Sequence, residues 1–80
     1  MDKNKDFYET NSLVLASTLI CLGFSLNSVT KTPENKATFL FLRTDTLNNI
    51  LTSFWQRSIK VEPNSFFEAQ RFLKSRIYGD

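Results

Sequence analysis

Histidine is absent from this 80-residue chain, and cysteine occurs once, as Cys21. Without histidine, the chain lacks the commonest general base and the commonest metal ligand. A single cysteine forms no intrachain disulfide, which fits a reducing compartment, so we expect a cytoplasmic protein. Cys21 lies in an apolar segment with no base beside it. It is therefore interpreted as a buried structural thiol rather than a nucleophile.

Glycine and proline are also scarce, with two of each. A phosphate-binding loop needs several glycines at fixed spacing, whereas Gly23 and Gly79 each follow a predicted helix. The acidic residues are spread singly, without the spacing of a calcium loop, so no metal site is predicted. Together these absences predict a protein that is not an enzyme, with no catalytic residues, no cofactor and no small-molecule substrate.

The longest apolar run covers residues 13–22. It is too short for a membrane-spanning helix, which needs about 20 apolar residues. A signal peptide begins with a net positive segment, whereas three acidic residues offset the two lysines before this run. The run is therefore interpreted as a buried helix, and no membrane association is predicted.

The composition is that of a folded chain, because 41% of the residues are hydrophobic and eight of the aromatic residues are Phe. The length suits one small domain. We expect a frayed N-terminus over residues 1–6 and a single α+β domain over residues 7–80. The net charge is +2, and the basic excess lies after residue 30.

The first helix is predicted to begin at a cap among residues 10–12 and to end before Gly23. One side of this helix carries large apolar residues. The opposite side holds Val14, Ser17, Thr18 and Cys21. Because that side is small and uncharged, we expect it to be covered, either by another part of the chain or by a second copy in a homodimer.

Two strands are predicted next, at residues 24–28 and 37–43, from their period-two alternation and apolar content. Pro33 marks a turn over residues 32–35, so the two strands are expected to form an antiparallel hairpin. Both faces of the second strand are apolar, which predicts a central strand covered on both faces. Residues 7–9 are either a further short strand or the lead-in to the first helix.

The pair at residues 44–45 offers the cap of a second helix, whose apolar residues recur at i, i+3, i+4, i+7 and i+8. Trp55 continues this apolar side and is interpreted as a core residue, the alternative being an exposed anchor for a protein partner. Glu62 and Pro63 open a third helix that ends before Gly79. The predicted order is β-α-β-β-α-α, an α+β fold in which helices pack on an antiparallel hairpin sheet.

Two cations alternate with two aromatic residues along one side of the third helix, at i, i+4, i+7 and i+11. These are Phe67, Arg71, Lys74 and Tyr78. Basic side chains bind phosphates and aromatic rings stack on bases, so this side predicts binding of DNA or RNA, with Arg76 extending the patch. The structural alternative is that Phe67 widens the core side, Tyr78 packs at the helix end, and the cations favour the helix dipole.

Two functions follow from these features. The leading hypothesis is a small non-enzymatic binding module that contacts nucleic acid through the third helix. The alternative is a protein-interaction or regulatory subunit that acts as a homo-oligomer through the Val14 side of the first helix.

A further set of residues, spread over residues 7–78, carries a resemblance. These are Thr10, Leu13, Leu15, Ala16, Leu19 and Gly23-Phe24, then Phe39 and Phe41, and finally Val61, Pro63, Phe66-Phe67, Ala69 and Leu73-Lys74-Ser75-Arg76-Ile77-Tyr78. In them the chain resembles a family of short uncharacterised bacterial, archaeal and phage proteins that share a domain of unknown function. One departure is Glu62, where an Asp is expected to cap the last helix. The resemblance implies the same architecture and no particular activity.

Overall fold

A computed structural model describes residues 6–31, 33–34 and 36–78 of the chain. Its elements are β1 (Phe7–Thr10), α1 (Leu13–Cys21), β2 (Leu26–Lys31), β3 (Ala37–Leu42), α2 (Asp45–Trp55) and α3 (Pro63–Tyr78). The predicted α+β class and the order β-α-β-β-α-α are confirmed, and residues 7–10 form a strand. Most of the segment predicted to be frayed lies outside the described residues, as do Gly79 and both ends of the predicted turn.

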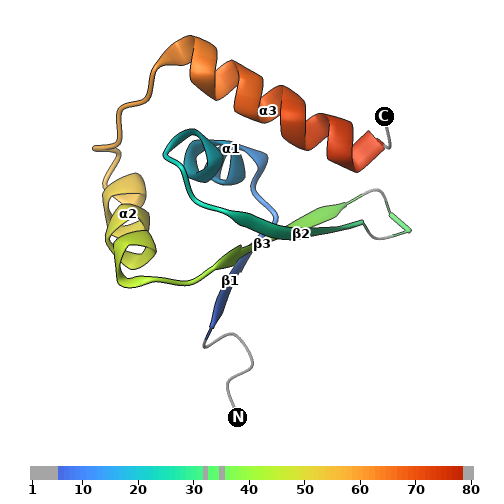
Figure 1. Ribbon diagram of the computed structural model, residues 1–80, viewed down its shortest axis with the longest axis horizontal. Helices are drawn as coiled ribbons and strands as arrows, with labels where there is room; N and C mark the ends of the chain where they lie inside the picture. Colours follow the sequence, from blue (N-terminus) through green and yellow to red (C-terminus); the bar gives the residue numbers. More distant parts are fainter. Residues whose placement is uncertain (1–5, 32, 35, 79–80) are drawn as a thin grey trace.

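The three strands form one antiparallel sheet in the order β1-β3-β2, so β3 is central as predicted. In Figure 1, α1 lies over one face of the sheet, α3 crosses above α1, and α2 stands beside them. Phe39 and Phe41 of β3 are buried on the covered face, whereas Leu42 on the other face is 51% exposed. The prediction that both faces are covered is therefore wrong, because all three helices gather on one face.

β2 begins at Leu26, two residues later than predicted. A bulge between Leu26 and Ser28 interrupts its alternation. Leu26 pairs with Phe41 and Val29 pairs with Phe39, so both lie on the core face although they are three residues apart. The predicted start was too early because Phe24, which continues the alternation, donates its N–H to the Leu19 carbonyl in the turn after α1.

The core is built around α1. Its fully buried apolar residues are Leu15, Ala16, Leu19, Phe39, Phe41, Leu47 and Leu73. They come from α1, β3, α2 and α3, so every helix contributes to one cluster. Each such Leu or Phe stabilises the fold by about 1.5–3 kcal/mol relative to an exposed side chain. The sheet and α3 therefore enclose α1 between them, as Figure 1 shows.

Side chains cap the start of each helix. Ser12 and Thr44 accept the backbone N–H of the residue three positions later, at 3.1 Å in α1 and 3.0 Å in α2. Before α3, the Glu62 carboxylate accepts the N–H groups of Asn64 at 3.0 Å and Ser65 at 2.8 Å. These hydrogen bonds, that of Asn64 foremost, lower the pKa of Glu62 below its ordinary value. Glu62 therefore caps α3 although a shorter Asp is expected there.

α1 and α2 each end in a hydrogen-bonded turn of the same type, the Schellman motif. The N–H groups of Gly23 and Phe24 donate to the carbonyls of Ile20 and Leu19, and those of Arg57 and Ser58 donate to Phe54 and Ser53. Each turn places one residue in the left-handed region, Gly23 with φ 97° and Arg57 with φ 61°. Gly23 was predicted in this role, and Arg57 was not.

Candidate nucleic-acid interface

α3 turns different sides to the core and to solvent. Its buried residues are Ala69 and Leu73. Because successive helical residues are about 100° apart, the side predicted to bind nucleic acid lies about 150° around the helix from this core side. We call its four residues the basic-aromatic stripe. Phe67 is 62% exposed, Tyr78 is 67% exposed, and both Arg71 and Lys74 are exposed. Phe67 therefore does not widen the core.

The stripe is long enough to contact more than one nucleotide. Tyr78 lies eleven positions after Phe67, which corresponds to about 16 Å along the axis of α3. Arg71 and Lys74 lie between the two rings. Glu68, the carboxylate within α3, lies three positions before Arg71 and about 60° around the helix from it, so one negative charge borders the stripe beside Arg71.

Arg76, which the sequence suggested as an extension of this patch, lies on the opposite flank of α3. It is two positions beyond Lys74, which corresponds to about 200° around the helix. Its guanidinium carbon lies 5.8 Å from the ring centroid of Phe72, an exposed residue of that flank. The structure therefore does not bring Arg76 to the stripe.

A lysine from the sheet joins the stripe instead. The ammonium nitrogen of Lys31, at the end of β2, lies 5.7 Å from the ring centroid of Tyr78. Sequence reasoning missed Lys31 because a contact between β2 and the last turn of α3 has no local signal. The basic excess after residue 30 was the only trace of it.

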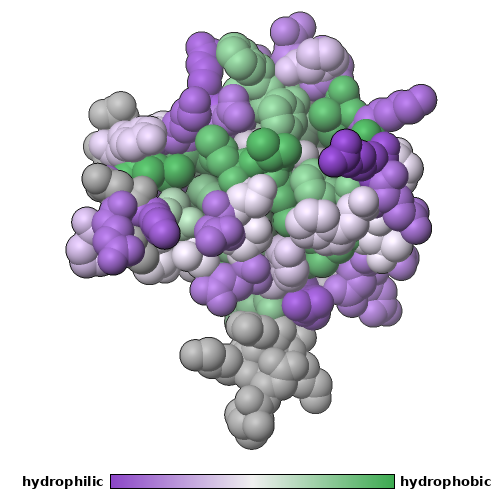
Figure 2. All heavy atoms as spheres, turned by 180° about the vertical axis from the view of Figure 1, so that it is seen from behind, coloured by the Kyte–Doolittle hydropathy of each residue, from purple (hydrophilic) through white to green (hydrophobic). Residues whose placement is uncertain are grey.

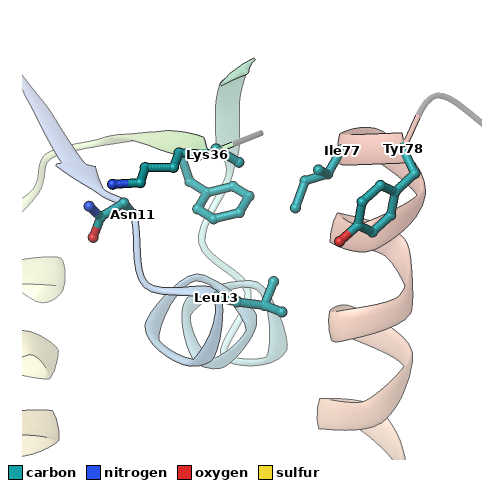
Figure 3. Close-up of a pocket in the computed structure, with 7 residues that line it drawn as sticks. Asn11, Leu13, Lys36, Ile77 and Tyr78 are labelled. Atoms are coloured by element: carbon teal, nitrogen blue, oxygen red, sulfur yellow. The ribbon is translucent and has the colours of Figure 1, made fainter. Parts of the chain in front are cut away.

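A cleft of about 410 Å³ adjoins Tyr78, within the size range of small-molecule sites. It is lined by Asn11, Leu13, Lys36, Ala37, Phe39, Ile77 and Tyr78. In Figure 3, Ile77 and Tyr78 extend from α3 toward the cleft, and Asn11 and Lys36 lie on the opposite side. Amide, ammonium and phenol groups thus border an apolar floor, a combination that suits a base or a sugar.

The side of α1 predicted as an interface is partly buried and partly exposed in the structure. Ser17 and Thr18 are buried within the chain, whereas Val14 is 52% exposed. The hydroxyl of Thr18 donates to the carbonyl of Val14 at 2.8 Å, so its polar atom has a partner. The chain itself therefore covers the centre of this side. Self-association through what remains, Val14 and the margin at Cys21, stays a prediction.

Two further predictions about single residues are wrong. Cys21 is half-buried rather than buried, because it lies in the last turn of α1, beyond the buried residues Leu15–Leu19. Trp55 is 66% exposed rather than a core residue. It lies at the last position of α2, and helical periodicity alone does not show where the core beneath a helix ends.

The surface opposite the view of Figure 1 is partly apolar. Figure 2 shows hydrophobic side chains across the middle of this face and up to its top edge, with polar side chains at the sides and below. Within the part of the chain that the structure describes, no three residues able to bind a metal ion lie together. In that same part, no helix has both the length and the apolar character needed to cross a membrane.

Comparison of the sequence with known proteins assigns the chain to a family. Residues 5–79 match the family model described as "Domain of unknown function (DUF5659)". No curated protein and no solved structure matches the chain. The match includes α3 with its stripe as well as the sheet and α1. Because it spans nearly the whole chain, this protein belongs to the DUF5659 family, as the resemblance to a domain of unknown function predicted.

Proposed function

We propose that this protein is a non-enzymatic module that binds nucleic acid through the basic-aromatic stripe of α3 and Lys31. The observation that carries the proposal is the joint exposure of two aromatic rings and two cations along one helix side. An exposed ring contributes little to folding, because the hydrophobic gain comes from removing apolar area from water. Exposed rings with cations between them match the surfaces that bind single strands, where rings stack on bases and cations bind the backbone.

Binding would begin with the phosphates. Arg71, Lys74 and Lys31 would each neutralise a phosphate and release condensed counterions, which makes the affinity depend steeply on salt. Phe67 and Tyr78 would then stack on bases, an interaction that tolerates any sequence because every base has a π-face. The module would therefore bind with little sequence preference.

The first experiment measures binding of fluorescently labelled single strands and duplexes, of DNA and of RNA, by anisotropy at low salt. We expect Arg71→Glu and Lys74→Glu each to lower the affinity about tenfold and to flatten the salt dependence by about one phosphate contact. Arg76→Glu is the matched control, since it reverses one charge on the opposite flank of α3. No binding to any of the four probes, or an equal loss with Arg76→Glu, would overturn the proposal.

The second experiment tests the rings in the same assay. Phe67→Ala and Tyr78→Ala should each weaken binding roughly 5- to 100-fold, the range expected for one lost base-aromatic stack. Phe72→Ala removes an exposed ring from the opposite flank of the same helix and serves as the control. Equal affinities for Phe67→Ala and Phe72→Ala would rule out stacking on Phe67.

A further inference from the structure

A second cleft, of about 460 Å³, lies where α2 ends and the connector to α3 begins. It is lined by Thr18, Phe54, Trp55, Arg57, Ile59 and Val61. It shares no lining residue with the cleft beside Tyr78. Among the described residues that line it, Arg57 is the only charged one. The site therefore combines an apolar interior with a single positive charge.

Trp55 is held in place while remaining exposed. Its ring meets that of Phe54 edge to face, with centroids 5.1 Å apart and planes at 82°. This geometry fixes the orientation of the indole without a parallel ring stacked on it. With 66% of the residue exposed, the indole has area available for stacking. An oriented, accessible indole beside a cleft is suited to bind a flat aromatic ligand.

Arg57 occupies a backbone position that ordinarily favours glycine. Its φ of 61° is left-handed, and the matching position after α1 is Gly23. Glycine enters this region without steric cost, and Asn tolerates it better than Arg does. The turn after α2 would form at least as well with either residue. A strained position at the mouth of a cleft points to a role for its side chain rather than for its backbone.

We propose that this Trp55–Arg57 cleft holds one unpaired nucleobase of a single-stranded nucleic acid. The base would stack on the indole of Trp55, and the guanidinium of Arg57 would bind the adjoining phosphate. The charge favours this occupant, because an apolar peptide side chain would leave the guanidinium without an anion. A base within a duplex is paired and already stacked, so it does not enter such a cleft.

This inference rests on the proposed function and adds a second contact site to the nucleic-acid surface of α3. Val61 of this cleft lies two residues before α3, and the Tyr78 cleft lies at the other end of that helix. α3 has 16 residues and is therefore about 24 Å long. The Trp55–Arg57 cleft therefore adjoins the segment that leads into α3, and Tyr78 lies at the far end of that helix, a separation that an extended single strand would have to bridge.

Trp55 is the only tryptophan in the chain, so fluorescence excited selectively in tryptophan, and not in Tyr8 or Tyr78, reports on this cleft alone. We expect single-stranded oligothymidylate to quench Trp55 saturably, at the concentrations at which anisotropy detects binding. A duplex of the same length should bind without quenching. Binding of the single strand without quenching would overturn this inference and leave the proposed function intact, whereas no anisotropy change would overturn both.

Variants test the two side chains separately. Arg57→Asn keeps a residue that tolerates the left-handed turn, and we expect it to lower single-strand affinity about fivefold without lowering duplex affinity. Arg76→Asn removes the same charge elsewhere and should have little effect. Trp55→Ala, at an exposed position, should lower the single-strand affinity about tenfold. Circular dichroism verifies that this variant is folded. Single-strand affinities of Arg57→Asn and Trp55→Ala equal to that of the parent protein would overturn the inference.

Discussion

α1 and α2 are built alike at both ends but differ in what surrounds them. Each begins with a hydroxyl cap, from Ser12 or Thr44, and each ends in the same two-bond turn. α1 lies in the middle of the core, whereas α2 is fully buried only at Leu47. The left-handed position that closes α1 is Gly23, and the one that closes α2 is Arg57.

This difference separates structural residues from candidate functional ones. Gly23 meets the steric requirement of its turn, and a Cβ added there would contact nothing within 4 Å. Arg57 is not the residue that its turn favours sterically, and it lines a cleft beside an exposed tryptophan. The end of α1 therefore serves the fold, while the end of α2 carries residues that the fold alone does not explain.

The largest expected effect tests the difference in burial. Leu19→Ala in α1 should lower the free energy of unfolding by about 3 kcal/mol, because it leaves a cavity in a fully enclosed site. Ile50→Ala in α2 should cost about half as much, since Ile50 is only half-buried. Urea denaturation of both variants measures the two losses. Equal losses would show that α2 is as integral to the core as α1.

The next effect concerns the left-handed position after α1. Gly23→Ala should lower the free energy of unfolding by about 1–2 kcal/mol, because an L-residue is strained at this φ. No steric clash adds to the loss, since the space around the position is open. Thermal denaturation should show a lower midpoint with an unchanged far-UV spectrum. An unchanged midpoint would mean that the turn does not constrain this residue.

The matching change after α2 should have the opposite sign. Arg57→Gly should raise the free energy of unfolding by about 0.5 kcal/mol, because glycine relieves the left-handed strain at some cost in unfolded-chain entropy. Arg76→Gly is the control. It should lower the free energy of unfolding by about 1 kcal/mol, because glycine is unfavourable within a helix such as α3. A destabilised Arg57→Gly protein would show that the Arg57 side chain supports the fold, which would remove the contrast with Gly23.

The smallest effect concerns the cap of α3, which differs from the hydroxyl caps of α1 and α2 in being ionisable. Because folding lowers the pKa of Glu62, its contribution to stability is complete above the ordinary value of 4.5 and is lost as the pH falls through the lower folded pKa. Thermal midpoints of the parent protein and Glu62→Gln should therefore differ at pH 7 and converge below pH 4.5. A difference that persists in acid would assign the effect to packing instead.

Sequence reasoning succeeded where one element decides the outcome. The stripe of α3 follows from helical spacing alone, and the structure leaves all four of its residues exposed. Reasoning failed for Trp55, which has the spacing of a core residue but lies beyond the edge of the core. It also failed for Lys31, whose contact with Tyr78 joins elements far apart in the chain. Periodicity gives the direction of a side chain, not what lies in that direction.

The sequence by itself determined the order of the elements after the first strand, confined the caps to residues 10–12 and 44–45, and located the glycine turn after α1. These features depend on hydrogen bonds and steric limits within a few residues. Only the tertiary structure decided that one face of the sheet stays open, that Ser17 is enclosed, and that Arg57 meets Trp55 at a cleft. Burial depends on how separate elements pack, and packing joins residues that no local pattern connects.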